Sequence, residues 1–151
     1  MISLPPDLPP IHDPSPTELE ECITYSATYF HINPNVIKAI VAVENGKVGS
    51  MVKNTNNTYD MGVMQINTIH LPDIHAKYPD LTWKEIAYNT CINVAIGTAI
   101  LRDRINELRP GDNLWTAVGN YSSKTPRIRN EYLKKVLTAY HRIMYDKGRI
   151  E

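Results

Sequence analysis

Several features that identify common classes of protein are missing from this chain of 151 residues. No apolar run approaches the ~18 residues that favour a membrane-spanning helix. The N-terminus lacks the basic, apolar and small-residue regions of a secretory signal, so we expect either a processed form or a chain made without one. Sixteen Lys and Arg balance 16 Asp and Glu, which argues against the basic surface of nucleic-acid-binding proteins. We therefore expect no transmembrane segment and no nucleic-acid partner.

Motifs that bind phosphate groups or metal ions are missing too. The sequence contains no glycine-rich phosphate loop, no HExxH and no CxxC. Its five histidines are scattered, and the closest pair, His70 and His75, is poorly spaced for one helix face. We therefore expect neither a metal site nor a cofactor.

Cysteine is scarce as well. Cys22 and Cys91 each lie at or near the start of an apolar helical pattern, and neither has a partner at metal-site spacing. The residues alone leave two states open: two buried free thiols, or one disulfide that joins the first helix to a later one. Such a disulfide would close a loop of about seventy residues and stabilise the fold by roughly 4 kcal/mol.

The overall composition is that of one globular domain. Hydrophobic residues make up 42% and charged residues 21% of the chain, which is long enough for one buried core. Residues 1–16 contain six prolines and therefore read as an extended, poorly ordered arm. We expect the folded domain at residues 17–145 and a C-terminal tail at residues 146–151.

Helix start signals divide the domain. Ser15–Glu18, Asn33–Pro34, Thr82–Glu85 and Thr125–Pro126 each combine a capping residue with a proline or a glutamate. Gly46 fits the stop of the second helix. The core face expected for the last helix comprises Ile128, Leu133, Val136, Leu137 and Tyr140.

The fold class follows from these signals and from the segment between the second helix and the later ones. Residues 45–58 are rich in Asn, Gly, Ser and Thr, and residues 58–67 are compatible with a short strand. The sequence therefore predicts a mainly α protein with one small irregular or β lobe inserted after the second helix.

One carboxylate, Glu44, stands at the end of an apolar helix. A glutamate at a helix C-terminus opposes the helix dipole, and Val41, Ala42 and Val43 beside it are apolar. Glu44 is therefore either a solvated surface residue or a functional one. In the functional interpretation, burial keeps the carboxyl protonated near neutral pH, and a protonated carboxyl is the general acid of glycosidic bond cleavage.

Asp60, sixteen positions later, is a candidate for a second, ionised carboxylate, although an Asp near a turn commonly caps backbone groups. A sugar site also needs amides and aromatic rings. The candidates are Tyr59, Gln65, Asn67, Trp115 and Tyr121. Gln65 and Asn67 have the alternative role of bonding loop backbone.

Four segments together resemble the lytic transglycosylases of the lysozyme-like superfamily. They are Phe30–Ile40, Glu44 with Tyr59–Asn67, Cys91–Gly97 (CINVAIG) and Trp115–Tyr121 (WTAVGNY). The match is to the small soluble type associated with secretion, conjugation and pilus systems, and it covers roughly residues 19–140.

The resemblance implies a lysozyme-like fold with Glu44 as catalytic acid and then base. It implies that Gln65 lines the cleft beside Glu44 and that Tyr121 orients the carboxyl. The spacing of Asp60 from Glu44, similar to that of the two catalytic carboxylates of animal-type lysozymes, makes it the candidate second catalytic carboxylate. Tyr59 and Asn67 are the expected substrate contacts by their residue type. The resemblance also implies a disulfide between Cys22 and Cys91, which favours an oxidising compartment, the bacterial periplasm.

The implied activity is cleavage of the MurNAc–GlcNAc β-1,4 bond in peptidoglycan glycan strands, which opens the wall locally for a secretion, conjugation or pilus apparatus. Two departures from the family pattern are Asn45 after Glu44, and Ser122-Ser123-Lys124 after Tyr121. A hydrolytic muramidase and a non-catalytic peptidoglycan-binding assembly factor therefore remain alternatives. We expect a monomer, with a component of the apparatus as a hypothetical partner.

Overall fold

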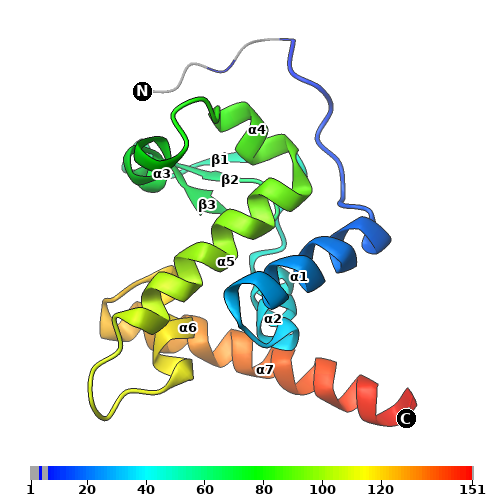
Figure 1. Ribbon diagram of the computed structural model, residues 1–151, viewed down its shortest axis with the longest axis vertical. Coiled ribbons are helices and arrows are strands. Elements are labelled where there is room, and N and C mark those ends of the chain that lie inside the picture. Colours follow the sequence, from blue (N-terminus) through cyan, green and yellow to red (C-terminus); the bar gives the residue numbers. More distant parts are fainter. Residues whose placement is uncertain (1–3, 5–6, 151) are drawn as a thin grey trace.

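The computed structural model describes residue 4 and residues 7–150. The protein is mostly helical with one small sheet, which confirms the predicted mainly α fold with an inserted β lobe (Figure 1). The helical elements are α1 (Pro16–Phe30), α2 (Pro34–Glu44), η1 (Thr68–His70), α3 (Leu71–Lys77), α4 (Trp83–Tyr88), α5 (Thr90–Asn106), α6 (Leu114–Ser122) and α7 (Pro126–Ile150). The strands are β1 (Met51–Lys53), β2 (Tyr59–Met61) and β3 (Ile66–Asn67).

Helix starts follow the predicted capping residues. The Ser15 and Asn33 side chains accept backbone hydrogen bonds at the starts of α1 and α2, and Thr82 and Glu85 form a reciprocal capping box at α4. The end of α2 differs from the expectation. Asn45, rather than Gly46, takes the left-handed conformation (φ 50°) at the C-cap.

The β lobe is an antiparallel sheet in the order β1-β2-β3. Its register places Asp60 opposite Val52 on one side and opposite Asn67 on the other. The sequence did not indicate η1 and α3, which follow the sheet. α3 has only 7 residues and no side-chain cap at its N-terminus, so it has neither the length nor the start signal that pattern analysis needs.

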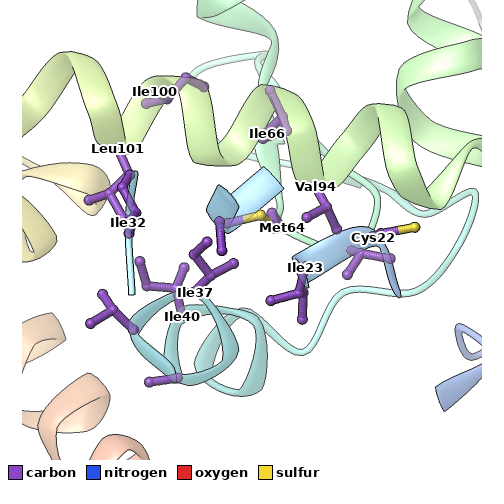
Figure 2. Packing of buried hydrophobic residues seen from close by; sticks show 14 of the residues in the cluster. Cys22, Ile23, Ile32, Ile37, Ile40, Met64, Ile66, Val94, Ile100 and Leu101 are labelled. Atoms are coloured by element: carbon purple, nitrogen blue, oxygen red, sulfur yellow. The ribbon is translucent and has the colours of Figure 1, made fainter. Parts of the chain in front are cut away.

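α5 is the central helix. It packs against α1, α4 and α6, while α7 packs against α2 and α6 (Figure 1). Figure 2 shows the apolar core that α1, α2 and α5 enclose, where Ile37, Ile40 and Leu101 are fully buried. Met64 and Ile66 from the β lobe reach the same core. The lobe and the helices therefore share one core, which fixes their relative position.

A buried side chain on α5, Asn93, attaches the lobe to the helices. Asn93 Oδ1 accepts a hydrogen bond from the Met64 backbone N–H at 2.7 Å. Asn93 Nδ2 donates to the carbonyls of Met61 and Ile86, each at 2.9 Å. One turn further along α5, Gly97 lacks a side chain where the Met64 sulfur packs against the helix. Asn93 and Gly97, both in the segment CINVAIG, thus allow close contact between α5 and the lobe.

Cys22 of α1 and Cys91 at the start of α5 form a disulfide across 69 positions of sequence. Of the two states that the residues left open, the structure therefore contains the cross-linked one. The bridge joins the first helix to the central helix.

The described part of the proline-rich segment is mostly exposed but makes contacts with the loop after α2 and with α4. The backbones of His12 and Val48 form an antiparallel bridge, and the Tyr88 hydroxyl donates to the Pro9 carbonyl at 2.8 Å. An extended segment next to a loop can satisfy the exposed backbone groups of that loop, which explains the docking. Residues 1–3 and 5–6 of the predicted arm lie outside the described residues.

The C-terminal region is helical rather than a separate tail. α7 continues to Ile150, so residues 146–150 belong to it, and residue 151 lies outside the described part of the chain. Within the described residues, no helix has the length and apolar character needed to cross a membrane. The bounds of the functional domain at 17–145 stay a prediction.

Candidate active site

A cleft of about 600 Å³ is lined by the β lobe, by η1 and α5, and by the region where α6 passes into α7. Its lining residues are Glu44, Asn54, Asn56, Thr58, Asp60, Gln65, Ile66, Asn67, Ile69, His70, Ile100, Tyr121, Ser122, Ser123 and Ile128. Amides, hydroxyls and two carboxylates predominate, which suits a ligand rich in hydroxyl and amide groups.

Glu44 is the last residue of α2, and its carboxyl is partly buried in the cleft. Tyr132 of α7 donates a hydrogen bond to Glu44 Oε2 at 2.6 Å. Burial raises the pKa of Glu44 from 4.5 to about 7, the hydrogen bond from Tyr132 lowers it, and the charge of Asp60 raises it. The Glu44 carboxyl can therefore release and take up a proton near neutral pH, which agrees with the role expected for a carboxyl at an apolar helix end.

Tyr132 is a site residue that the sequence did not predict. Burial, and then the charge of Glu44, raise the pKa of its hydroxyl, so it remains a hydrogen-bond donor. Tyr132 precedes Val136 and Tyr140 by one and two helical turns, so periodicity could have placed it on the inner face of α7. No local pattern could have paired it with Glu44, 88 positions away.

Tyr121 lies beside Glu44 but does not hold it. Its hydroxyl donates to the Met64 carbonyl at 3.0 Å. The hydrogen bond to the Glu44 carboxyl comes from Tyr132. The orienting role that the resemblance implies for Tyr121 stays a prediction. Burial and the charge of Glu44 raise the pKa of Tyr121, so this hydroxyl also stays protonated. Tyr121 therefore fixes the lobe segment around Met64 against α6.

Asp60 of β2 lines the same cleft, and its charge acts on Glu44. Asn67, directly opposite on β3, donates from Nδ2 to Asp60 Oδ1 at 3.0 Å and to Thr58 Oγ1 at 3.1 Å. Asn67 Oδ1 accepts from the Ile69 backbone N–H at 2.9 Å. Asn67 thus orients Asp60 and caps η1, which is the structural role left open for it, while it also lines the cleft.

Gln65 lies in the cleft wall in a left-handed conformation (φ 53°), which is uncommon for a residue other than glycine. Its Nε2 donates to the Gly62 carbonyl at 2.8 Å and to Ser50 Oγ at 3.2 Å. These bonds leave the side-chain carbonyl of Gln65 as the group that can meet a ligand. At Gly46 a Cβ would collide with the Gly62 carbonyl, so the loop after Glu44 packs directly on this wall.

Two of the predicted sugar contacts lie outside the cleft lining. Tyr59 is absent from it, and its backbone N–H donates to Thr68 Oγ1 at 3.1 Å. Trp115 packs edge-on against Tyr140, with ring centroids 5.1 Å apart. Conversely, Ile128, predicted on the core face of α7, is 40% exposed and lines the cleft. It lies in the first turn of α7.

A mostly helical fold with an inserted three-stranded lobe, and a cleft in which a partly buried glutamate lies near a second carboxylate, define a lysozyme-like glycosidase. The chain belongs to the transglycosylase SLT domain family, whose model matches residues 21–143. Members of this family are lytic transglycosylases that act on peptidoglycan, and this protein is an enzyme of that type.

Similar curated proteins come from enteric bacteria. The chain is 33% identical over 132 residues to a peptidoglycan-binding-like protein of Escherichia coli O157:H7, with 81% of this chain and 77% of that protein covered. It is 30% identical to invasion protein IagB of Salmonella typhimurium, covering 84% and 79%. It is 27% identical to protein IpgF of Shigella flexneri, covering 82% and 80%. The similarity therefore extends over most of each chain.

Proposed function

We propose that the protein cleaves the MurNAc–GlcNAc β-1,4 bond of peptidoglycan glycan strands and leaves 1,6-anhydro-MurNAc ends. The observation that carries this proposal is the Glu44 carboxyl, which lies in the cleft, is held by Tyr132 and has a pKa of about 7. A carboxyl with such a pKa can donate a proton at neutral pH and can then accept one.

In the first step Glu44 donates its proton to the glycosidic oxygen, and the bond between that oxygen and C1 of MurNAc breaks. Positive charge develops on the sugar ring. The negative charge of Asp60, or the substrate's own N-acetyl group, stabilises this charge. The hydrogen bond from Tyr132 stabilises the carboxylate that forms on Glu44.

In the second step the Glu44 carboxylate takes the proton of the C6 hydroxyl of the same sugar, and the C6 oxygen bonds to C1. The step consumes no water, closes the anhydro ring and returns Glu44 to its protonated form. One residue therefore serves as both acid and base, which matches a pKa close to the working pH.

The experiment that tests the proposal is mass spectrometry of fragments released from purified peptidoglycan, with Glu44→Gln as the control. We expect anhydro-muropeptides from the wild type and none from the variant, whose fold remains intact. Normal turnover by Glu44→Gln would overturn the mechanism. If the wild type binds sacculi and releases no fragments, the binding-protein alternative is favoured. The departures from the family pattern at Ser122 and Ser123, which line the cleft, would then explain the loss of cleavage.

A hydrolytic muramidase is the second candidate, and Asp60 is the observation that favours it. Asp60 shares the cleft with Glu44, as the second carboxylate of a hydrolytic glycosidase does. If water rather than the C6 hydroxyl attacks C1, the fragments carry reducing ends. We expect Asp60→Asn to lose much of the activity in either case, and an unchanged rate would reduce Asp60 to a structural role.

We also infer that the enzyme acts in the periplasm and opens the wall for a secretion, conjugation or pilus apparatus. The disulfide supports an oxidising compartment, and one relative is named an invasion protein. Fractionation of producing cells, followed by alkylation of free thiols, tests the compartment. We expect a periplasmic, monomeric protein in which neither Cys22 nor Cys91 reacts.

A further inference from the structure

A second groove, of about 300 Å³, adjoins the active-site cleft. The two cavities share His70 and Ile100 in their linings, so they meet between η1 and α5. We call the second cavity the side groove. Its walls include Tyr29 and Phe30 of α1, Asp73 and Lys77 of α3, and Asp103 and Arg104 of α5.

The side groove combines exposed aromatic rings with unpaired charges. Tyr29 is 68% exposed, and Tyr78, which also lines the groove, is 61% exposed. Within the described residues, the side chains of Asp73, Lys77 and Asp103 form no hydrogen bond or ion pair. The walls therefore offer two carboxylates and one ammonium group without a hydrogen-bond or ion-pair partner among the described residues. They also offer two exposed rings, of which Tyr29 packs edge-on against Phe30 with ring centroids 4.8 Å apart.

These charges act on the junction with the cleft. Burial and then the charge of Arg104 lower the pKa of His70, while Asp73 and Asp103 raise it. Arg104 is itself held by Glu107, at 2.6 Å between its Nη1 and Oε1. The groove thus has one cation held by an ion pair, Arg104, and two carboxylates whose charges also reach the junction at His70.

We propose that the side groove binds the peptide stem that branches from the lactyl group of MurNAc, an inference that rests on the proposed function. The sugar backbone of a stem-bearing strand carries no charge, so a further stretch of glycan would leave the two carboxylates and Lys77 unmatched. A stem carries free carboxylates and, where it contains a diamino acid, an ammonium group. Asp73 and Asp103 then pair with the ammonium group, Lys77 with a carboxylate, and the Tyr rings pack against aliphatic parts of the stem.

The position of the groove matches the shape of such a substrate. The strand occupies the cleft, and a branch from it reaches the side groove past His70 and Ile100. A stem held there fixes which MurNAc lies next to Glu44, so the groove sets the register of the strand. The enzyme therefore prefers strands whose stems are intact over strands from which an amidase has removed them.

Binding and cleavage measurements on the two kinds of strand test this inference. Binding is measured with the Glu44→Gln protein, which leaves the strands uncut, and cleavage is measured separately with the wild type. The groove variants are Asp73→Asn with Asp103→Asn, and Tyr29→Ala. The matched controls are Asp146→Asn, outside the groove, and Tyr25→Ala, one turn earlier on α1 and outside the side groove.

We expect stem-bearing strands to bind about tenfold more tightly than stem-free strands, since a charge-assisted hydrogen bond contributes about that factor or more. The groove variants should reduce this ratio to about one, and the controls should keep it. Equal affinity for the two kinds of strand, a ratio that survives the groove variants, or no binding to either would overturn the inference. Wild-type cleavage of both strands at equal rates would leave the proposed function standing while the stem site fails.

Discussion

At the scale of single residues, the environment of Glu44 is a balance between two opposing effects. Burial disfavours the carboxylate, and the hydrogen bond from Tyr132 favours it, and burial is the larger effect because the pKa rises to about 7. Tyr121 lines the same cleft, yet its hydroxyl donates to the Met64 carbonyl. The two tyrosines therefore have different tasks, one electrostatic and one architectural.

Tyr132→Phe tests the electrostatic task. The substitution removes a hydrogen bond that lowers the pKa of Glu44, so this pKa should rise further and the carboxylate formed during the reaction should lose its donor. We expect kcat/KM to fall about tenfold, since a hydrogen bond to a charged group is worth ~1.5–3 kcal/mol. The alkaline limb of the pH profile should move to higher pH, because protonated Glu44 persists there. Tyr140→Phe, on the same helix, is the control, and an unmoved limb would show that Tyr132 only packs.

Glu44→Gln should change stability in a pH-dependent way. The pKa of Glu44 is raised in the folded state, from 4.5 to about 7, so the folded protein binds more protons than the unfolded chain between these values. The contribution of Glu44 to wild-type stability is therefore full below pH ~4.5 and is lost, by up to about 3 kcal/mol, as the pH rises through 7. Urea unfolding at pH 4.5 and at pH 8 should show that the free energy of unfolding of the variant, relative to that of the wild type, is more favourable at pH 8. A constant difference between the two proteins would contradict the raised pKa.

At the scale of secondary structure, the sequence predicts what is local and misses what is set by distant contacts. Ser15, Asn33 and Thr82 cap helices as expected, because capping joins residues two or three positions apart. The left-handed conformation of Gln65 is uncommon for a glutamine, and one of the hydrogen bonds of its side chain goes to Ser50, 15 positions earlier, which no local pattern indicates. Likewise, Glu44 could be singled out from its apolar helix, whereas its partner Tyr132 could not.

Gly46→Ala tests the contact between the loop after α2 and the cleft wall at Gly62. A Cβ at this position would collide with the Gly62 carbonyl, a backbone atom that cannot rotate away. We expect a loss of about 3 kcal/mol in the free energy of unfolding and a large loss of activity, since Gln65 moves with the same wall. Gly148→Ala is the matched control, because no atom lies within 4 Å of the added methyl group. If both variants unfold at the wild-type urea concentration, the loop does not pack as described.

At the scale of the whole molecule, two long-range connections tie the N-terminal region to the rest. The disulfide joins α1 to α5, and the backbone bridge between His12 and Val48 joins the proline-rich segment to the loop after α2. The sequence indicated the cysteine pair only through the family resemblance. Docking of the proline-rich segment could not be predicted, because prolines in sequence indicate an extended chain but not the surface on which it lies.

Replacing both cysteines by serine should lower the free energy of unfolding by about 4 kcal/mol, because the 69-residue separation makes a large loop. Urea unfolding with and without a reductant measures the effect. The wild type should become as unstable as the double variant once it is reduced, and the double variant should not respond to the reductant. A reductant that leaves the wild-type midpoint unchanged would show that the bridge does not carry this stability.

The carboxamide of Asn93 also has a consequence for the order of folding. Its partners Met64, Met61 and Ile86 lie 29, 32 and 7 positions away, so its three hydrogen bonds form only once α5, α4 and the lobe have assembled. These hydrogen bonds hold the lobe to the helices. Within the described residues the lobe has no separate hydrophobic core, so it is not expected to fold before they form. We expect that truncation of Asn93 accelerates unfolding far more than it slows refolding, because interactions absent from the transition state affect mainly the unfolding rate. The rate at which the lobe separates from the helices, rather than the speed of its assembly, then depends on this buried amide together with the shared core.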